Sequence, residues 1–177
     1  MNDLDDLRFP IGRFAAPASS MAGIRTAHIQ TLRLLPERLR AATSGLTDAQ
    51  LDTPYREEGW TCRQVVHHLA DSHANAYIRF KLALTEDWPT IKTYDESAWA
   101  NLPDSRWLPI ESSLSMITAL HARWVELLDS MDDEGFHRGF NHPDMGRQNL
   151  AKALALYEWH SRHHTAHITR LRSRQGW

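Results

Sequence analysis

TCRQVVHHLADSHANAYIRFKLALT, residues 61–85, is the part of the chain whose pattern most directly indicates how it folds. Apolar and small side chains recur in it every three or four positions, which is the spacing of one face of an α-helix. The expected inward face consists of Val65, His68, Leu69, Ser72, Ala76 and Phe80. We therefore predict a long helix in which the imidazole of His68 faces the protein interior.

Three other segments carry the same helical spacing, at residues 21–43, 110–130 and 149–174. Their expected buried faces consist of Ile24, His28, Leu32, Leu35 and Leu39, then of Leu114, Ile117, His121, Trp124 and Leu128, and finally of Leu150, Leu154, Tyr157, Ser161, His164, Ile168 and Leu171. Pro36 lies inside the first segment and should kink or split that helix, because proline lacks the N–H that a helix interior needs.

The connecting segments are expected to hold little regular structure. Residues 1–20 should form an extended arm, and residues 131–148 should be irregular. Between the first two long helices, a capping box of Thr47 and Gln50 predicts a short helix directly after Thr47. The connection at residues 87–109 is long enough to be a crossover packed over the bundle by aromatic side chains. Its aromatic residues are Trp88, Tyr94, Trp99 and Trp107. No run of alternating residues predicts a sheet.

Four long amphipathic helices, with one long connection between the second and the third, predict an all-α four-helix bundle. The chain has 177 residues, which suits a single domain over residues 1–177. No apolar run approaches the roughly 20 residues that cross a bilayer, so we expect no membrane partner. The formal net charge is −2 and no basic stripe occurs, so we expect no nucleic-acid partner.

Two features favour a cytoplasmic location. The lone cysteine, Cys62, cannot form an internal disulfide, which fits a reducing compartment. The N-terminal sequence MNDLDDLRFPIGRF is acidic at its start and contains no apolar stretch, which argues against a secretory signal.

The 11 histidines are clustered, and three of them suggest a metal site. His160 and His164 lie four positions apart on one helix, so their rings share a face and can bind one ion together. This pair alone is a weak signal, but His68 faces inward on another helix and needs partners for its ring nitrogens. Three neutral imidazoles would form the open site typical of catalytic zinc, and nickel would also suit them.

Other residues near these positions are weaker candidates for metal binding or for proton transfer. His67 should be partly exposed and His163 exposed, because helical spacing turns both away from the inward faces. His121 faces inward, where a hydrogen-bonded core histidine is the favoured interpretation and a fourth ligand is the alternative. No catalytic residue is identified. The candidates for moving protons are Asp71, His142 and His167.

Two long blocks of the sequence resemble the DinB/YfiT-like superfamily, and its YfiT branch in particular. The blocks are GWTCRQVVHHLADSH at 59–73, continued by YIRFKLALTE at 77–86, and YEWHSRHHTAHI at 157–168. Shorter matches are LDTPYR at 51–56, LHARW at 120–124 and FNHP at 140–143. The resemblance covers nearly the whole chain.

This resemblance implies an up-down-down-up four-helix bundle that is usually dimeric. It also implies one divalent metal ion per subunit, bound by the histidine that directly precedes a leucine on the second long helix, here His68, and by His160 and His164. Proteins of this branch are generally labelled metal-dependent hydrolases. The branch and its wider superfamily have also been connected to low-molecular-weight thiols, including bacillithiol S-transfer.

Three functions therefore remain open. The first is a hydrolase acting on a small-molecule substrate, in which the ion activates water. The second is a thiol S-transferase, in which the ion holds a cofactor sulfur as thiolate and Arg79 or Arg63 meets the carboxylates of that cofactor. The third is a non-catalytic metal-binding stress protein, which a fourth protein ligand such as His121 or His142 would support.

Overall fold

The computed structural model describes residues 3–16 and 22–177. Within these ranges, the four long helices are α2 (Ala22–Thr43), α4 (Cys62–Thr85), α7 (Glu111–Asp129) and α9 (Leu150–Gln175). Their limits lie within one or two residues of those predicted, and the four-helix bundle is confirmed. The predicted start of the first long helix at Met21 lies outside the described residues.

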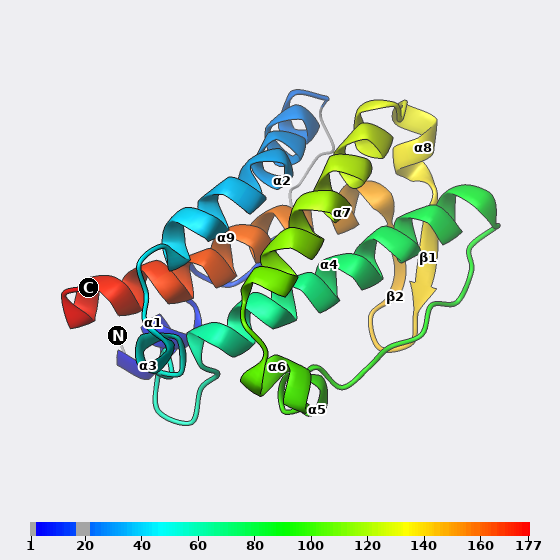
Figure 1. Ribbon diagram of the computed structural model, residues 1–177. Coiled ribbons are helices and arrows are strands. Elements are labelled where there is room, and N and C mark those ends of the chain that lie inside the picture. The colour runs from blue at the N-terminus through cyan, green and yellow to red at the C-terminus, as the bar shows by residue number, and fades with distance from the viewer. Residues whose placement is uncertain (1–2, 17–21) are drawn as a thin grey trace.

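The four long helices are arranged so that each contacts two of the others (Figure 1). Helix α2 packs against α7 and α9, and α4 packs against the same two helices. Figure 1 shows α2 and α9 running in one direction and α4 and α7 in the opposite one, which is the predicted up-down-down-up order. Because α4 and α7 are parallel neighbours, the chain between them must return along the whole length of the bundle.

Local signals in the sequence place the helix ends. Thr61 and Gln64 form a capping box at the start of α4. The predicted capping box at Thr47 is also present and begins the short helix α3 (Asp48–Leu51). Helix α9 begins where the Asn149 side chain accepts a hydrogen bond from the Lys152 N–H. It ends at a glycine in the left-handed conformation, with a φ of 71°.

The core consists of two apolar clusters along the bundle axis. One is built around Trp124 and the other around Leu69. On α4, α7 and α9, the residues between the two clusters are largely polar and buried: Ser72, His73, His121, Ser161, His163, His164 and His167. A layer rich in histidine therefore crosses the middle of the bundle. Since buried polar groups need partners, this layer is where hydrogen bonds or a bound ion are required.

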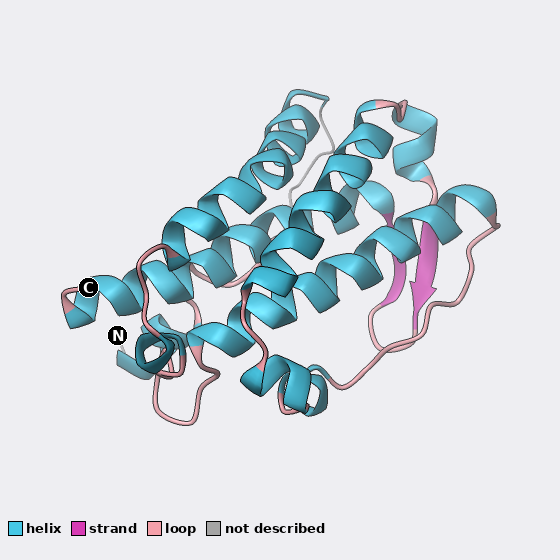
Figure 2. Cartoon of the chain, viewed as in Figure 1, coloured by secondary structure: helices cyan, strands magenta, loops and turns pink. Residues whose placement is uncertain are grey.

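The prediction that the chain contains no sheet is wrong. Strands β1 (Gly139–His142) and β2 (Gly146–Asn149) form an antiparallel hairpin, drawn in magenta in Figure 2. The short helix α8 (Asp133–His137) precedes it, so the segment expected to be irregular is mostly regular. Strand β2 reads Gly-Arg-Gln-Asn and has no apolar side chain, so the alternation that indicates a half-buried strand is missing.

The N-terminal segment also differs from the prediction. Its residues 3–8 form helix α1 (Asp3–Arg8) rather than an extended arm, while residues 1–2 and 17–20 of that arm lie outside the described part. The following segment lies along α9, where the Trp159 indole N–H donates to the Gly12 carbonyl at 3.1 Å. This segment therefore covers one side of the histidine layer.

The crossover contains helices α5 (Glu96–Ala100) and α6 (Pro103–Trp107). The expectation that its aromatic residues pack over the bundle is only partly met, because Trp99 is 37% and Trp107 68% exposed.

Pro36 does not split α2, which is continuous through that position. No helix in the described ranges combines the length and apolarity needed to cross a membrane.

Candidate metal centre

The three histidines predicted as metal ligands lie together in the structure. Helices α4 and α9 are antiparallel neighbours, so His68 on α4 lies opposite His160 and His164 on α9. Their candidate ligand atoms all lie within 4.8 Å of one another. The ring centroids of His160 and His164 are 4.4 Å apart, and that of His68 is 5.2 Å and 4.8 Å from them.

The nitrogen positions suit a shared ion. The Nε2 atoms of His68 and His160 lie 3.2 Å apart. Two ligands of a tetrahedral zinc ion, with Zn–N distances of 2.0–2.1 Å, are separated by about 3.3 Å. The two rings are therefore spaced as a common ion would require, and a donor set of three imidazoles suits zinc or nickel.

The three rings are also in the protonation state that ligands need. Burial lowers the pKa of His68 to about 4. Burial likewise lowers the pKa values of His160 and His164 well below their usual value, and the neighbouring histidines lower them further. Neutral imidazoles keep a lone pair for a metal ion at physiological pH.

Two further histidines extend this cluster: His73, which the sequence did not single out, and His121, for which a core position was the favoured interpretation and a fourth ligand the alternative. His73 is fully buried, and its Nε2 lies 3.2 Å from Nδ1 of His160. Its Nδ1 lies 2.9 Å from Nε2 of His121. His121 Nδ1 in turn lies 2.7 Å from the Leu32 carbonyl oxygen. His121 is thus a hydrogen-bonded core histidine, the favoured interpretation, and both of its nitrogens are occupied.

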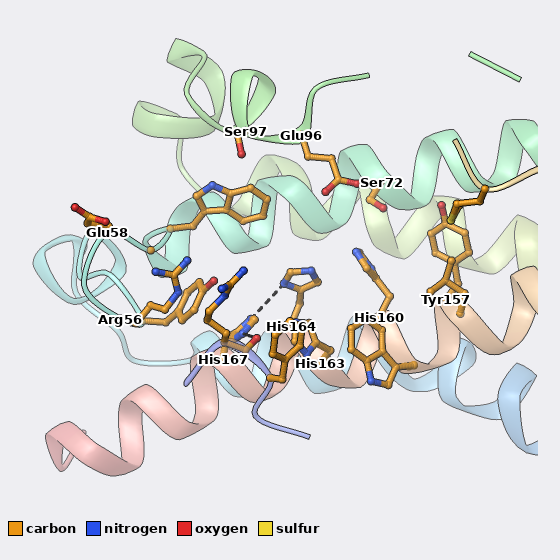
Figure 3. A pocket seen from close by; sticks show the side chains of 18 of the residues that line it. Arg56, Glu58, Ser72, Glu96, Ser97, Tyr157, His160, His163, His164 and His167 are labelled. Carbon is orange, nitrogen blue, oxygen red and sulfur yellow. Dashed lines mark hydrogen bonds between the residues drawn. The ribbon is translucent and has the colours of Figure 1, made fainter. Parts of the chain in front are cut away.

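His167 supports His164 in a similar way. Nε2 of His167 lies 3.2 Å from the Arg8 carbonyl oxygen, to which it must donate, so its Nδ1 is left as an acceptor. That Nδ1 lies 3.4 Å from Nδ1 of His164, the contact dashed in Figure 3. The Nδ1–H of His164 can therefore donate to His167, which leaves Nε2 of His164 for an ion.

His163, His164 and His167 form a second group of three buried histidines with ligand atoms within 4.8 Å. This group shares His164 with the first, so two ions could be held only if that ring bridged them. The predicted exposure of His163 is wrong, since it is 6% exposed. Trp159 stacks on it at 4.3 Å, and Phe9 of the N-terminal segment lies 6.0 Å away.

Three other candidate residues, His67, Arg63 and Asp71, are not part of this histidine cluster. His67 is 4% exposed rather than partly exposed, and it hydrogen-bonds to Ser113 and to the Leu108 carbonyl. Arg63 is buried against Asp48 and Asp52 instead of facing the site. Asp71 does not line the cavity beside the histidines. Burial and the charge of Asp104 raise the pKa of its carboxyl to about 6.

A cavity of about 530 Å³ opens beside the histidine cluster (Figure 3). His160 and His164 line it, and so do His142 and His167. His142 lies at the end of β1, where burial lowers its pKa, and its Nδ1 accepts from two backbone N–H groups. The charged residues of the wall are Arg8, Arg56, Glu58, Arg79 and Glu96.

Glu96 is a candidate for proton transfer that the sequence did not reveal, because it lies in the crossover, where no periodicity orients a side chain. Figure 3 shows its carboxyl directed toward Ser72, on the opposite side of the cavity from α9. Although the residue as a whole is exposed, desolvation raises the pKa of this carboxyl, and Arg79 lowers it in part. The geometry therefore places a carboxyl of raised pKa on the wall of the same cavity.

The fold and the site together define a helical bundle with a candidate histidine metal centre at its middle. Comparison with known proteins agrees with this class. The model of the DinB superfamily matches residues 31–168, and the chain belongs to that superfamily.

Relatives with full-length similarity carry names that mention a metal. A protein of Bacillus cereus strain AH820, named "putative metal-dependent hydrolase", is 55% identical over 174 residues, which is 98% of this chain and 100% of that protein. A Bacillus anthracis strain A0248 protein of the same name has the same identity and coverage.

Solved structures give the same picture of the fold. YfiT from Bacillus subtilis, described as a probable metal-dependent hydrolase with an unusual four-helix bundle topology, superposes with a TM-score of 0.95. It is 51% identical, with 97% of this chain and 99% of that chain covered. Another four-helix bundle protein, 20% identical with a TM-score of 0.56, covers 86% of this chain and 99% of its own and shares the fold alone.

Proposed function

We propose that this protein is a metal-dependent hydrolase in which His68, His160 and His164 hold one zinc or nickel ion beside the cavity. The observation that carries the proposal is the convergence of three neutral imidazoles, of which His68 and His164 are buried and His160 is half-buried. His160 and His164 also line a cavity large enough for a small molecule. The names of the relatives, which mention metal-dependent hydrolysis, support the same proposal.

The three protein ligands leave an open coordination position, as in catalytic zinc sites. A bound divalent ion supplies Lewis acidity toward a substrate oxygen or a water molecule. The remaining steps belong to the chain itself. Trp60 lies 4.6 Å from the ring of His68 and limits the access of bulk water, and Arg79 binds an anionic group of the substrate. The Glu96 carboxyl accepts a proton, which its raised pKa favours.

The test is an activity screen on purified protein loaded with zinc or nickel, using ester, amide and phosphoester substrates that carry an anionic group. We expect turnover that is lost on chelation and restored by the ion. His164→Ala should abolish it, whereas His137→Gln, which changes an exposed histidine outside the cavity, should not. Equal turnover in the His164→Ala variant would contradict the proposal.

A thiol S-transferase is the second candidate, favoured by the charge of the cavity wall. Three arginines, Arg8, Arg56 and Arg79, line the cavity with only two carboxylates, so an anionic thiol cofactor would be accommodated. The ion would hold the cofactor sulfur as thiolate. Incubation of the loaded protein with bacillithiol and an alkylating electrophile separates the candidates. A conjugate formed without hydrolysis of the test substrates would select the transferase.

A non-catalytic metal-binding protein is the third candidate. It would need a fourth protein ligand, as structural zinc sites have. His121 is occupied at both nitrogens, so it does not favour this function. The homodimer expected from the family resemblance stays a prediction, which light scattering of the purified protein tests directly.

A further inference from the structure

Pro36 leaves one carbonyl of α2 without its usual helical partner. In an α-helix the N–H of residue 36 would bond to the carbonyl of residue 32, but proline has no N–H. The Leu32 carbonyl oxygen instead lies 2.7 Å from Nδ1 of His121, which belongs to α7. The backbone hydrogen bond that Pro36 removes from the continuous helix α2 thus leaves an acceptor for a buried histidine on a neighbouring helix.

This acceptor sets the direction of every hydrogen bond that follows. A carbonyl oxygen only accepts, so Nδ1 of His121 carries the proton and Nε2 of the neutral ring is a lone pair. Nδ1 of His73, 2.9 Å away, must then be the donor. Nε2 of His73 is consequently a lone pair, and Nδ1 of His160, 3.2 Å away, carries the next proton.

This series of hydrogen bonds ends at His160, one of the three proposed metal ligands. With its proton on Nδ1, the neutral ring of His160 has a lone pair on Nε2, the atom that lies 3.2 Å from Nε2 of His68. Both intermediate rings are almost fully enclosed, with His73 0% and His121 1% exposed. Water therefore does not reach the nitrogens of these two rings. No other order of donors satisfies the Leu32 carbonyl.

We propose that the Leu32 carbonyl freed by Pro36, together with His121 and His73, fixes His160 in the tautomer that presents Nε2 to the metal ion. His121 and His73 are positioning residues: neither is proposed to touch the ion or a substrate. The proposal rests on the metal centre proposed above, and it extends that centre to a third and a fourth helix. Bonds of this kind orient a ligand ring and raise its basicity.

Long-range ¹H–¹⁵N spectra of the metal-free, ¹⁵N-histidine-labelled protein report the tautomer of each ring and need no activity. We expect His121, His73 and His160 all to be protonated on Nδ1, with resonances assigned by single His→Gln variants. A His160 ring protonated on Nε2 would overturn the proposal. This result would stand whether or not the protein is a hydrolase.

Metal affinity gives a second measurement, by competition between the protein and a chelator for Zn²⁺ or Ni²⁺. His121→Phe removes both nitrogens and should weaken binding about 10- to 100-fold, as loss of such outer partners typically does. His121→Gln keeps an acceptor near the position of Nε2 and should bind within about threefold of the unchanged protein. If a folded His121→Phe protein bound the ion as tightly as the unchanged protein, the proposed role of His121 in positioning His160 would be contradicted.

Pro36→Ala tests the role of the free Leu32 carbonyl without changing a buried histidine. This test can be made even if His121→Phe fails to fold. The new N–H competes with His121 for the Leu32 carbonyl. We expect weaker metal binding together with an unchanged or higher melting temperature, a combination that a purely structural role would not give. A higher melting temperature with unchanged affinity would reject the anchoring role. A wild-type chain that binds neither ion would reject the metal centre, while the tautomer spectra would still test the hydrogen-bond order.

Discussion

The Nε2 atoms of His68 and His160 lie 3.2 Å apart, although the two residues are separated by 92 positions in the sequence. Two neutral rings at this distance can share at most one hydrogen bond. His160 already donates through its other nitrogen, in the order that the Leu32 carbonyl imposes. Nε2 of His160 is therefore a lone pair, which can accept a hydrogen bond from His68 in the metal-free protein. An ion between the two rings would take the place of that proton.

Metal binding should stabilise the native state, because the three rings come together only in the folded chain. An ion at about 100 times its dissociation constant would add about 2.7 kcal/mol, or about 5 to 10 °C in melting temperature for a chain of this size. Scanning calorimetry with and without Zn²⁺ or Ni²⁺ measures the shift. An unchanged melting temperature at saturating ion would argue against the centre.

The neighbours His67 and His68 form a matched pair, since both are buried on α4. His68→Gln should lower metal affinity at least about 10-fold, because it removes a ligand. His67→Gln should leave affinity unchanged and cost about 1–3 kcal/mol of stability, because the Ser113 hydroxyl and the Leu108 carbonyl lose their partner. Chelator competition and urea unfolding of both variants check this, and reversed outcomes would place the ion elsewhere.

Stability of the metal-free protein should fall as the pH is lowered from about 6.5 to 4. The pKa of His121 is lowered by burial to about 4, so the unfolded chain takes up a proton there before the native state does. The contribution of His121 is fully present above pH 6.5 and lost toward pH 4, and it amounts to about 3 kcal/mol. Urea unfolding at several pH values, repeated on His121→Gln, measures it. Constant stability from pH 7 to pH 4.5 would contradict it.

Glu96→Gln should lower kcat by about 10²- to 10⁴-fold, which is the usual effect of removing a general base. Metal affinity should not change, since this carboxyl is not in the histidine cluster. Glu58→Gln is the control, because Glu58 lines the same cavity and is assigned no proton transfer. Equal rates for the two variants would show that Glu96 has no special role.

The long helices and the three converging histidines follow from helical spacing, which depends only on the local chain. Exposure was less predictable. His163 is covered by Phe9 and Trp159, and His67 by the segment around Leu108, and helical spacing within one segment does not reveal a covering segment from elsewhere in the chain. His73 shares the inward face with Leu69, Ala76 and Phe80, so its burial was open to prediction, although its hydrogen bonds depend on two other helices.

Crystals grown with Zn²⁺ or Ni²⁺, with anomalous scattering recorded on both sides of the metal absorption edge, test the central claim most directly. We expect one anomalous peak per chain at about 2.0–2.1 Å from Nε2 of His68, His160 and His164. A peak bound instead by His163 and His167, or no peak in this layer of the bundle, would contradict it.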